Sequence, residues 1–133
     1  MAGTGARDEI RVVFDQLLQA QNAGDAAGVR AGLSESPDAV HIGTDADEWW
    51  TSKQIVDAVA AAGGADEIQV VADDVDVHVK GDVAWVEGRG RFTTAGGAER
   101  PVRMTGVFVR EDGQWKAVQS HASIGVPNDE IFG

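Results

Sequence analysis

The sequence contains no cysteine, which excludes disulfides, thiolate catalysis and thiolate metal sites. Basic residues are also scarce, 11 against 22 acidic ones, and the formal net charge is −11. Proteins bind nucleic acids and anionic membrane surfaces through basic groups, so neither is expected as a partner. No apolar run reaches the length of a membrane span, and the N-terminus lacks the apolar segment of a signal peptide. A cytoplasmic location is therefore expected.

What the sequence does contain is typical of one globular domain. Its 133 residues are 43% hydrophobic and 25% charged, which is sufficient for a buried core. We find no linker, no internal repeat and no low-complexity segment, and therefore expect a single domain over residues 1–133.

The first half of the chain predicts three helices. Apolar residues recur at helical spacing from a cap at Thr4 to Gly24, and Asp25 is placed to cap a second, shorter helix. Thr51 begins a third helix, because Gln54 three residues later completes a capping box. Between the last two helices lie a short strand, residues 39–43, and an acidic loop, residues 43–50.

The second half predicts four antiparallel strands in a meander. The strands cover residues 68–80, 83–94, 99–110 and 113–127, separated by turn residues. Helices followed by strands indicate an α+β fold, and we expect three N-terminal helices packed on one face of a curved antiparallel sheet.

Turn lengths predict which side chains share a face of the sheet. With residues 95–98 as one turn, the apolar face that the helices cover includes Arg103, Thr105, Val118 and Ser120. The opposite face carries aromatic, charged and hydrogen-bonding residues, as subunit interfaces do. We therefore predict a homodimer through that face, with this interface set: Trp85, Glu87, Arg89, Trp115, Gln119 and His121.

Two polar groups on the strands each have two interpretations. Asp74, Asp76 and His78 alternate along one strand and resemble metal ligands, but a solvated edge strand explains them better, and no metal is expected. His121 beside Gln119 and Ser123 resembles part of an acid–base site, yet the predicted register places it in the interface.

Two further groups concern a possible ligand. Asp45, Asp47 and Glu48 form either a carboxylate lid or a solvated loop whose tryptophans, Trp49 and Trp50, close the pocket mouth. Arg103, Thr105 and Ser120 are polar groups on an apolar face, the usual form of a small-molecule site, although Arg103 could instead extend to solvent.

Several motifs together resemble a known superfamily. They are the GD pair at residues 24–25, VHIGTDADEWW at 40–50, KGDVAW at 80–85 and REDGQWKAVQSHAS at 110–123. The whole chain resembles the nuclear transport factor 2-like superfamily, most closely its SnoaL-like and ketosteroid-isomerase-like branch. The resemblance implies a cone-shaped α+β barrel, a pocket between the helices and the concave face of the sheet, and dimers through the opposite face.

The resemblance also implies where a ketosteroid isomerase would carry its catalytic groups. The general-base aspartate matches Ile42, the oxyanion-binding aspartic acid matches Thr105, and the oxyanion-binding tyrosine lies near Leu17, in a chain without tyrosine. Ketosteroid isomerisation is therefore not expected. SnoaL-type cyclases use an acidic residue and a histidine in the pocket, which the motifs do not assign to particular positions here.

Two functions follow as hypotheses. In the first, the cone holds a small, mostly apolar organic molecule and acts on it by acid–base chemistry, as an isomerase, cyclase or dehydratase of secondary metabolism. In the second, the protein is a non-catalytic dimerisation or ligand-sensing module. No cofactor is expected in either. The predicted ligand-binding set is Phe14, Ile42, Trp49, Trp50, Arg103, Thr105, Val118 and Ser120.

Overall fold

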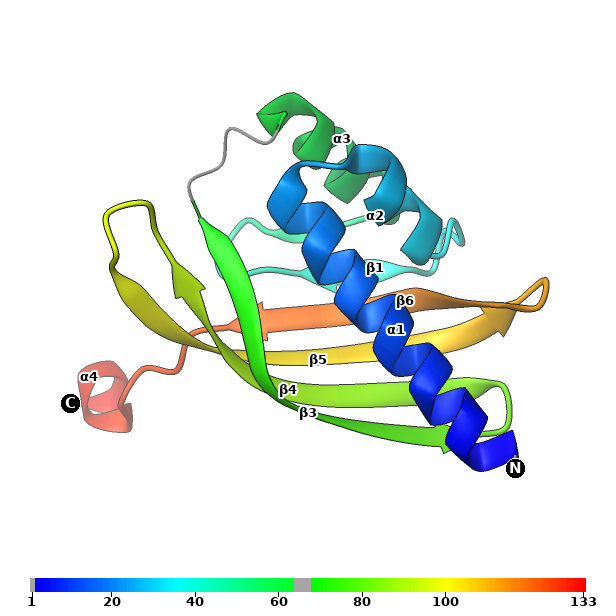
Figure 1. The fold of residues 1–133 in the computed structure, drawn as a ribbon. Coiled ribbons are helices and arrows are strands. Elements are labelled where there is room, and N and C mark those ends of the chain that lie inside the picture. Colours follow the sequence, from blue (N-terminus) through cyan, green and yellow to red (C-terminus); the bar gives the residue numbers. More distant parts are fainter. Residues whose placement is uncertain (1, 64–67) are drawn as a thin grey trace.

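The computed structural model of the protein describes residues 2–63 and 68–133. Helices lie against one face of a strongly curved sheet (Figure 1). The elements in chain order are α1 (Ala2–Ala23), α2 (Ala26–Gly32), β1 (Val40–Ile42), β2 (Trp49–Trp50), α3 (Ser52–Ala62), β3 (Gln69–Lys80), β4 (Val83–Thr93), β5 (Glu99–Glu111), β6 (Gln114–Ser123) and α4 (Asn128–Phe132).

The six strands form one open sheet in the order β2-β1-β6-β5-β4-β3. The predicted α+β class is confirmed, but the curved sheet does not close into the predicted barrel, and two further details of the prediction are wrong. The sheet is not purely antiparallel, because β1 pairs with β6 in parallel. A fourth helix, α4, follows the three N-terminal ones. The parallel pair brings the short segment before the acidic loop beside the end of the chain.

The helix boundaries follow from local chemistry. The side chain of Asp25 accepts a hydrogen bond from the backbone N–H of Gly28, and Thr51 forms the predicted capping box with Gln54. Gly63 ends α3 with a left-handed φ of 59°, which glycine adopts without strain. The predicted partner of this stop signal, Gly64, lies outside the described residues. Helix α1 begins at Ala2, earlier than the predicted cap at Thr4.

Two of the three predicted hairpins have the predicted register. Lys80 pairs with Val83 across a two-residue turn, and Arg110 pairs with Trp115. The second turn has positive φ at both central residues, 50° at Asp112 and 78° at Gly113, which suits the right-handed twist of the flanking strands.

The hairpin between β4 and β5 is one residue longer than predicted, so the prediction for β5 is wrong. Thr93 pairs with Glu99, and the N–H of Thr94 donates to the carbonyl of Ala98, so the loop contains five residues. A shift of one residue moves every side chain of a strand to the other face. Val102, Met104 and Phe108 are therefore buried, whereas Arg103 and Thr105 lie on the exposed convex face.

A bulge in β6 produces a second difference. Phe108 pairs with Ala117 and Val107 with Gln119, which leaves Val118 without a partner. Before the bulge, Trp115 and Ala117 point into the core. The prediction that Trp115 lies on the interface face is therefore wrong. After the bulge the predicted faces hold again, so that Ser120 is concave and Gln119 and His121 are convex.

The core lies between α1 and the concave face of the sheet. Ile10 and Phe14 from α1 are buried against Ala84, Val86 and Phe108 of the strands. The side chain of Asn22 extends the edge of the sheet, because it both donates to the carbonyl of Val70 and accepts from its N–H. These contacts fix α1 across the sheet and leave room beyond its C-terminal half.

Candidate functional site

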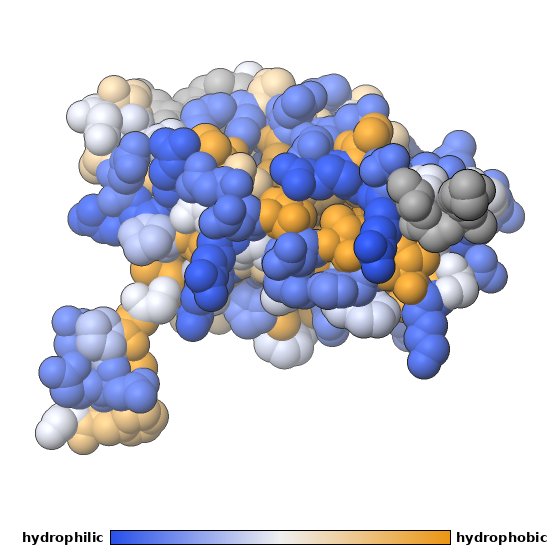
Figure 2. Space-filling model, turned by 60° about the horizontal axis from the view of Figure 1, so that its bottom comes forward, coloured by the Kyte–Doolittle hydropathy of each residue, from blue (hydrophilic) through white to orange (hydrophobic). Residues whose placement is uncertain are grey.

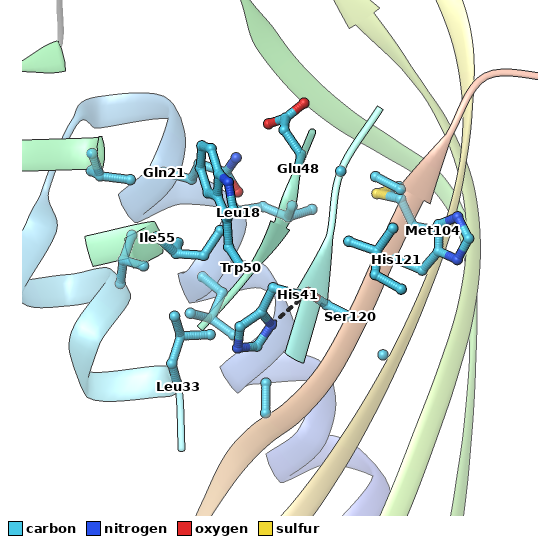
Figure 3. A pocket seen from close by; sticks show the side chains of 18 of the residues that line it. Leu18, Gln21, Leu33, His41, Glu48, Trp50, Ile55, Met104, Ser120 and His121 are labelled. Carbon is cyan, nitrogen blue, oxygen red and sulfur yellow. Dashed lines mark hydrogen bonds between the residues drawn. The ribbon is translucent and has the colours of Figure 1, made fainter. Parts of the chain in front are cut away.

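A cavity of about 330 Å³ lies beyond the C-terminal half of α1. Its walls come from α1, α3, β1, β2 and the concave face of β5 and β6, and most of them are apolar (Figure 3). The volume is within the range of small-molecule sites. Glycine and alanine on the sheet, Gly106, Ala117 and Ala122, keep the floor of this space open.

His41 on β1 is the most buried titratable group of the cavity, with only 4% of its surface exposed. Its Nδ1 lies 2.7 Å from the Ser120 hydroxyl on β6, and its Nε2 lies 3.0 Å from the Ser52 hydroxyl. Figure 3 shows the imidazole directed toward Ser120. The parallel pairing of β1 with β6, which sets His41 opposite Ser120, creates this contact.

Burial keeps this imidazole neutral near physiological pH. Loss of hydration lowers the pKa of His41 from its ordinary value, because the charged form loses more solvation than the neutral form. A neutral imidazole has one N–H and one free lone pair. One serine hydroxyl therefore accepts from the ring while the other donates to it, so His41 holds a proton and a base site at once.

This lowered pKa predicts a pH-dependent stability. The unfolded chain takes up a proton at residue 41 at higher pH than the folded chain does. The free energy of unfolding should therefore fall as pH drops below about 6.5, by at most about 1.4 kcal/mol per pH unit, until folded His41 is itself protonated. Urea unfolding between about pH 7.5 and about pH 5 would measure it. His41→Asn should remove this component, and an unchanged pH profile would contradict the assignment.

The cavity contains five of the predicted ligand-binding residues. Phe14, Ile42, Trp50, Thr105 and Ser120 all contribute to its wall, although Thr105 belongs to the convex row of β5 and its side chain is exposed. Leu17, Ile42 and Thr105, the positions that the resemblance assigned to isomerase chemistry, therefore all border the cavity without supplying a carboxylate or phenol.

The other three predicted ligand-binding residues lie outside it. Trp49 is 69% exposed, which leaves Trp50 as the tryptophan of the cavity. Arg103 is exposed on the convex face, where it donates to the Ser123 hydroxyl. Val118 is the unpaired residue of the bulge. The one-residue difference in the β4–β5 loop removes Arg103 from the concave face, and the bulge removes Val118 from it.

Only one carboxylate of the acidic loop reaches the cavity wall. Glu48 lies there, and its side chain accepts from the N–H of Asp45. Its carboxyl group packs so closely on Gly43 that an added Cβ there would lie 2.8 Å from the carboxyl carbon. Figure 3 shows the Glu48 carboxylate turned away from His41. Asp45 and Asp47 are exposed, so the solvated-loop interpretation describes them better.

Sequence reasoning missed His41 and Ser52. His41 lies between Val40 and Ile42 in a strand of three residues, too short for alternation to show which side faces inward. Ser52 directly follows the Thr51 cap, and no local pattern distinguishes it from an ordinary first-turn residue of a helix. The one available signal was the polar His41 between two apolar residues of a strand. Its role becomes apparent only once β6 is known to lie beside β1.

The other polar groups singled out in the sequence lie on the convex face of the sheet. His78 hydrogen-bonds through Nε2 to Glu87 at 2.7 Å and stacks on Trp85 with ring centroids 5.4 Å apart. Among the described residues no group of three potential ligands is placed to hold a metal ion. His121 is exposed in the convex row, opposite Thr105, although it too contributes atoms to the cavity wall.

The convex face does gather most of the predicted interface residues. Across β3 to β6 its successive rows are Lys80–Val83–Val109–Lys116, His78–Trp85–Val107–Gln119, Asp76–Glu87–Thr105–His121 and Asp74–Arg89–Arg103–Ser123. Trp115 is absent from these rows because it is buried under α1.

In the part of the chain that the structure describes, no helix is long and apolar enough to cross a membrane.

Comparison with known proteins agrees with this architecture. The family model described as a SnoaL-like domain matches residues 10–127. The chain belongs to this SnoaL-like family. The match includes every wall of the cavity. No curated protein matches the chain.

Solved structures similar to this SnoaL-like chain show the same fold. A nuclear transport factor 2-like protein of unknown function from Pseudomonas putida has a TM-score of 0.82 at 20% identity, covering 96% of this chain and 92% of that one. A candidate dehydratase of the same superfamily from Streptomyces avermitilis has a TM-score of 0.80 at 20% identity, covering 93% and 99%. A protein with a cystatin-like fold from Novosphingobium aromaticivorans has a TM-score of 0.75 at 19% identity, covering 94% and 86%. At these identities the likeness concerns the fold.

Proposed function

We propose that this SnoaL-like protein binds a small, largely apolar organic molecule in the cavity and exchanges protons with it through His41. One observation carries the proposal: a buried imidazole lies at a mostly apolar cavity with each ring nitrogen hydrogen-bonded to a serine hydroxyl. Isomerisation and dehydration both need a group that removes a proton from carbon and returns one elsewhere. The candidate dehydratase among the similar structures is consistent with this reaction class.

The two serines have different roles in this proposal. Ser52 is itself buried, so its hydroxyl holds the ring orientation from the first turn of α3. Ser120 is half-buried and lines the cavity, so its hydroxyl can pass a proton between His41 Nδ1 and a bound molecule. A ligand that fills this mostly apolar space would displace water from it, and the proton would then move between the ligand and the chain.

The wall also indicates the ligand's charge. Among the described residues that line the cavity there is no lysine or arginine, and Glu48 is the one carboxylate. An anionic ligand would have no cationic partner and would be repelled by Glu48. We therefore infer a molecule without negative charge that carries one carbonyl or hydroxyl group and is about the size of two fused rings.

The test uses 2-tetralone, an uncharged bicyclic ketone with acidic α-protons. Wild-type protein should bind it by calorimetry and speed the exchange of its α-protons in D2O at least about a hundredfold over buffer, as followed by NMR. Ser120→Leu should abolish binding because the larger side chain fills the space beside His41. His41→Asn should keep binding and lose the exchange.

A matched control is Gln119→Leu, which introduces the same leucine one residue earlier, on the convex side of β6. It should leave both binding and exchange unchanged. Binding without any exchange would refute proton transfer and favour a ligand-sensing module instead. Equal binding by Ser120→Leu and wild type would show that the ligand site lies elsewhere.

We also propose that the protein forms a homodimer through the convex face. Trp85 and Val83 are each 41% exposed there, next to Val107 and Val109 in the facing strand. Aromatic residues of this kind form the energetic centre of interfaces. Trp85→Glu should convert the dimer to a monomer in light scattering, because it adds a second carboxylate beside Glu87 in a desolvated contact. A wild-type protein that is monomeric at micromolar concentration would contradict the proposal.

A further inference from the structure

The C-terminal segment stands off from the body of the protein. Ile131 is 58% exposed and Phe132 is 81% exposed, and no residue of α4 is buried. In Figure 2 the segment forms a separate lobe with apolar surface at its outer end. Among the described residues, the hydrogen bonds of α4 are its own backbone bonds, to the carbonyls of Pro127 and Asp129. Two large apolar side chains on so short a helix have little reason to be exposed unless they meet another surface.

The convex face offers an apolar surface of matching kind. We define the convex apolar block as Val83, Trp85, Val107 and Val109, which are cross-strand neighbours on β4 and β5. Figure 1 looks onto the side of the sheet that α1 covers, and α4 is among the more distant parts, on the side away from α1. Helix α4 and the convex apolar block are thus on the same side of the sheet.

Charge complements this apolar match. Cations lie at both ends of the block in a protein whose net charge is −11: Lys80 flanks Val83, and Arg89 lies opposite Arg103 beyond Glu87 and Thr105. Lys116, beside Val109, instead donates to the carbonyl of Ala31. Facing like charges on a sheet are unfavourable without a counter-charge. In the described chain Arg89 has no ion pair, although Asp74 lies beside it, and Arg103 bonds only the Ser123 hydroxyl. Helix α4 carries two carboxylates, Asp129 and Glu130.

We propose that α4 of one copy docks on the convex apolar block of a second copy. Ile131 and Phe132 cover the valines and Trp85, while Asp129 and Glu130 lie next to the flanking cations. Two-fold symmetry makes this contact twice, so two short helices together add to one closed interface. The inference rests on the proposed dimer and adds to it the segment that holds the two copies together.

The first experiment compares the full chain with a chain that ends at Pro127. Sedimentation over a range of concentrations should show the dimer dissociation constant raised at least tenfold by the truncation, and similarly by the double variant Ile131→Ser, Phe132→Ser. Asp129→Lys with Glu130→Lys should also weaken the dimer, and more so at low salt. Val12→Ser is the matched control, since Val12 is an exposed apolar residue of α1. Circular dichroism checks that each variant is folded.

The second experiment uses the absence of cysteine from the chain. A mixture of F132C and V83C proteins should form an intermolecular disulfide under mild oxidation, whereas F132C with V12C should not. If the truncated chain dimerises like the full chain while Trp85→Glu is monomeric, the dimer stands and the docking of α4 is overturned. If the full chain is monomeric throughout, both proposals fail. The ligand proposal is independent of either result.

Discussion

Replacing Trp115 by alanine should lower the free energy of unfolding by about 3–5 kcal/mol, the usual cost of truncating a buried tryptophan. Trp115 is 4% exposed and lies beneath α1. Its Nε1 donates to the Glu9 carboxylate at 3.0 Å, and the Arg110 guanidinium lies 4.4 Å from the ring centroid. The substitution removes the packing and the ring hydrogen bond together. Urea unfolding would measure the loss.

Trp49→Ala provides the matched control for this prediction. The same residue type is removed, but Trp49 is 69% exposed, so the free energy of unfolding should change by no more than about 0.5 kcal/mol. Equal effects of the two substitutions would mean that Trp115 is not a core residue. Intrinsic fluorescence gives a second measurement, since loss of Trp115 should remove the emission of the most buried of the four tryptophans.

Replacing Gly90 by alanine should cost about 3 kcal/mol, at the upper end of the range for overpacking. A Cβ at this position would lie 1.9 Å from the carbonyl oxygen of Val71, and backbone cannot move aside as a side-chain tip can. Gly90 faces the irregularity in β3 between Ala72 and Asp74. The close approach bends this end of the sheet, which gives the concave face its curvature.

Gly88→Ala is the control, two residues away on the same face of the same strand. An added Cβ there would meet its nearest atom, the Asp74 carbonyl oxygen, at 3.4 Å, which is ordinary contact. The effect on the free energy of unfolding should stay within about 1 kcal/mol. If both alanine variants unfold at the same urea concentration, the close approach of β3 to β4 is not as described.

In these proposals the concave face of the sheet binds the ligand and the convex face forms the dimer contact. The concave face of β6 presents Ser120 to His41, and the convex face of the same strand presents Gln119 and His121. Variants of residues that serve one face alone should therefore have separate effects: Ser120 variants should alter ligand binding, and Trp85 variants should alter association.

Local signals in the sequence determined much of the fold. Asp25 and the Thr51–Gln54 capping box act within one helical turn, so the start of α2 and of α3 is legible without any tertiary contact. The two-residue turns before Val83 and Gln114 likewise set their registers locally. The apolar alternation of Val75, Val77 and Val79 then placed the concave side of β3 correctly.

Tertiary structure alone decided the rest, because the deciding contacts are distant in sequence. A flexible loop accepts four or five residues with little difference in local energy, so burial of Met104 and Phe108, rather than the loop, selected the register of β5. The bulge at Val118 shifts the alternation of β6 side chains between the two faces by one residue. Trp115, before the bulge, therefore lies in the core, and Ser120, after it, lies at the cavity. His41 and Ser120 are 79 residues apart, and their hydrogen bond exists only because β1 adds in parallel to β6.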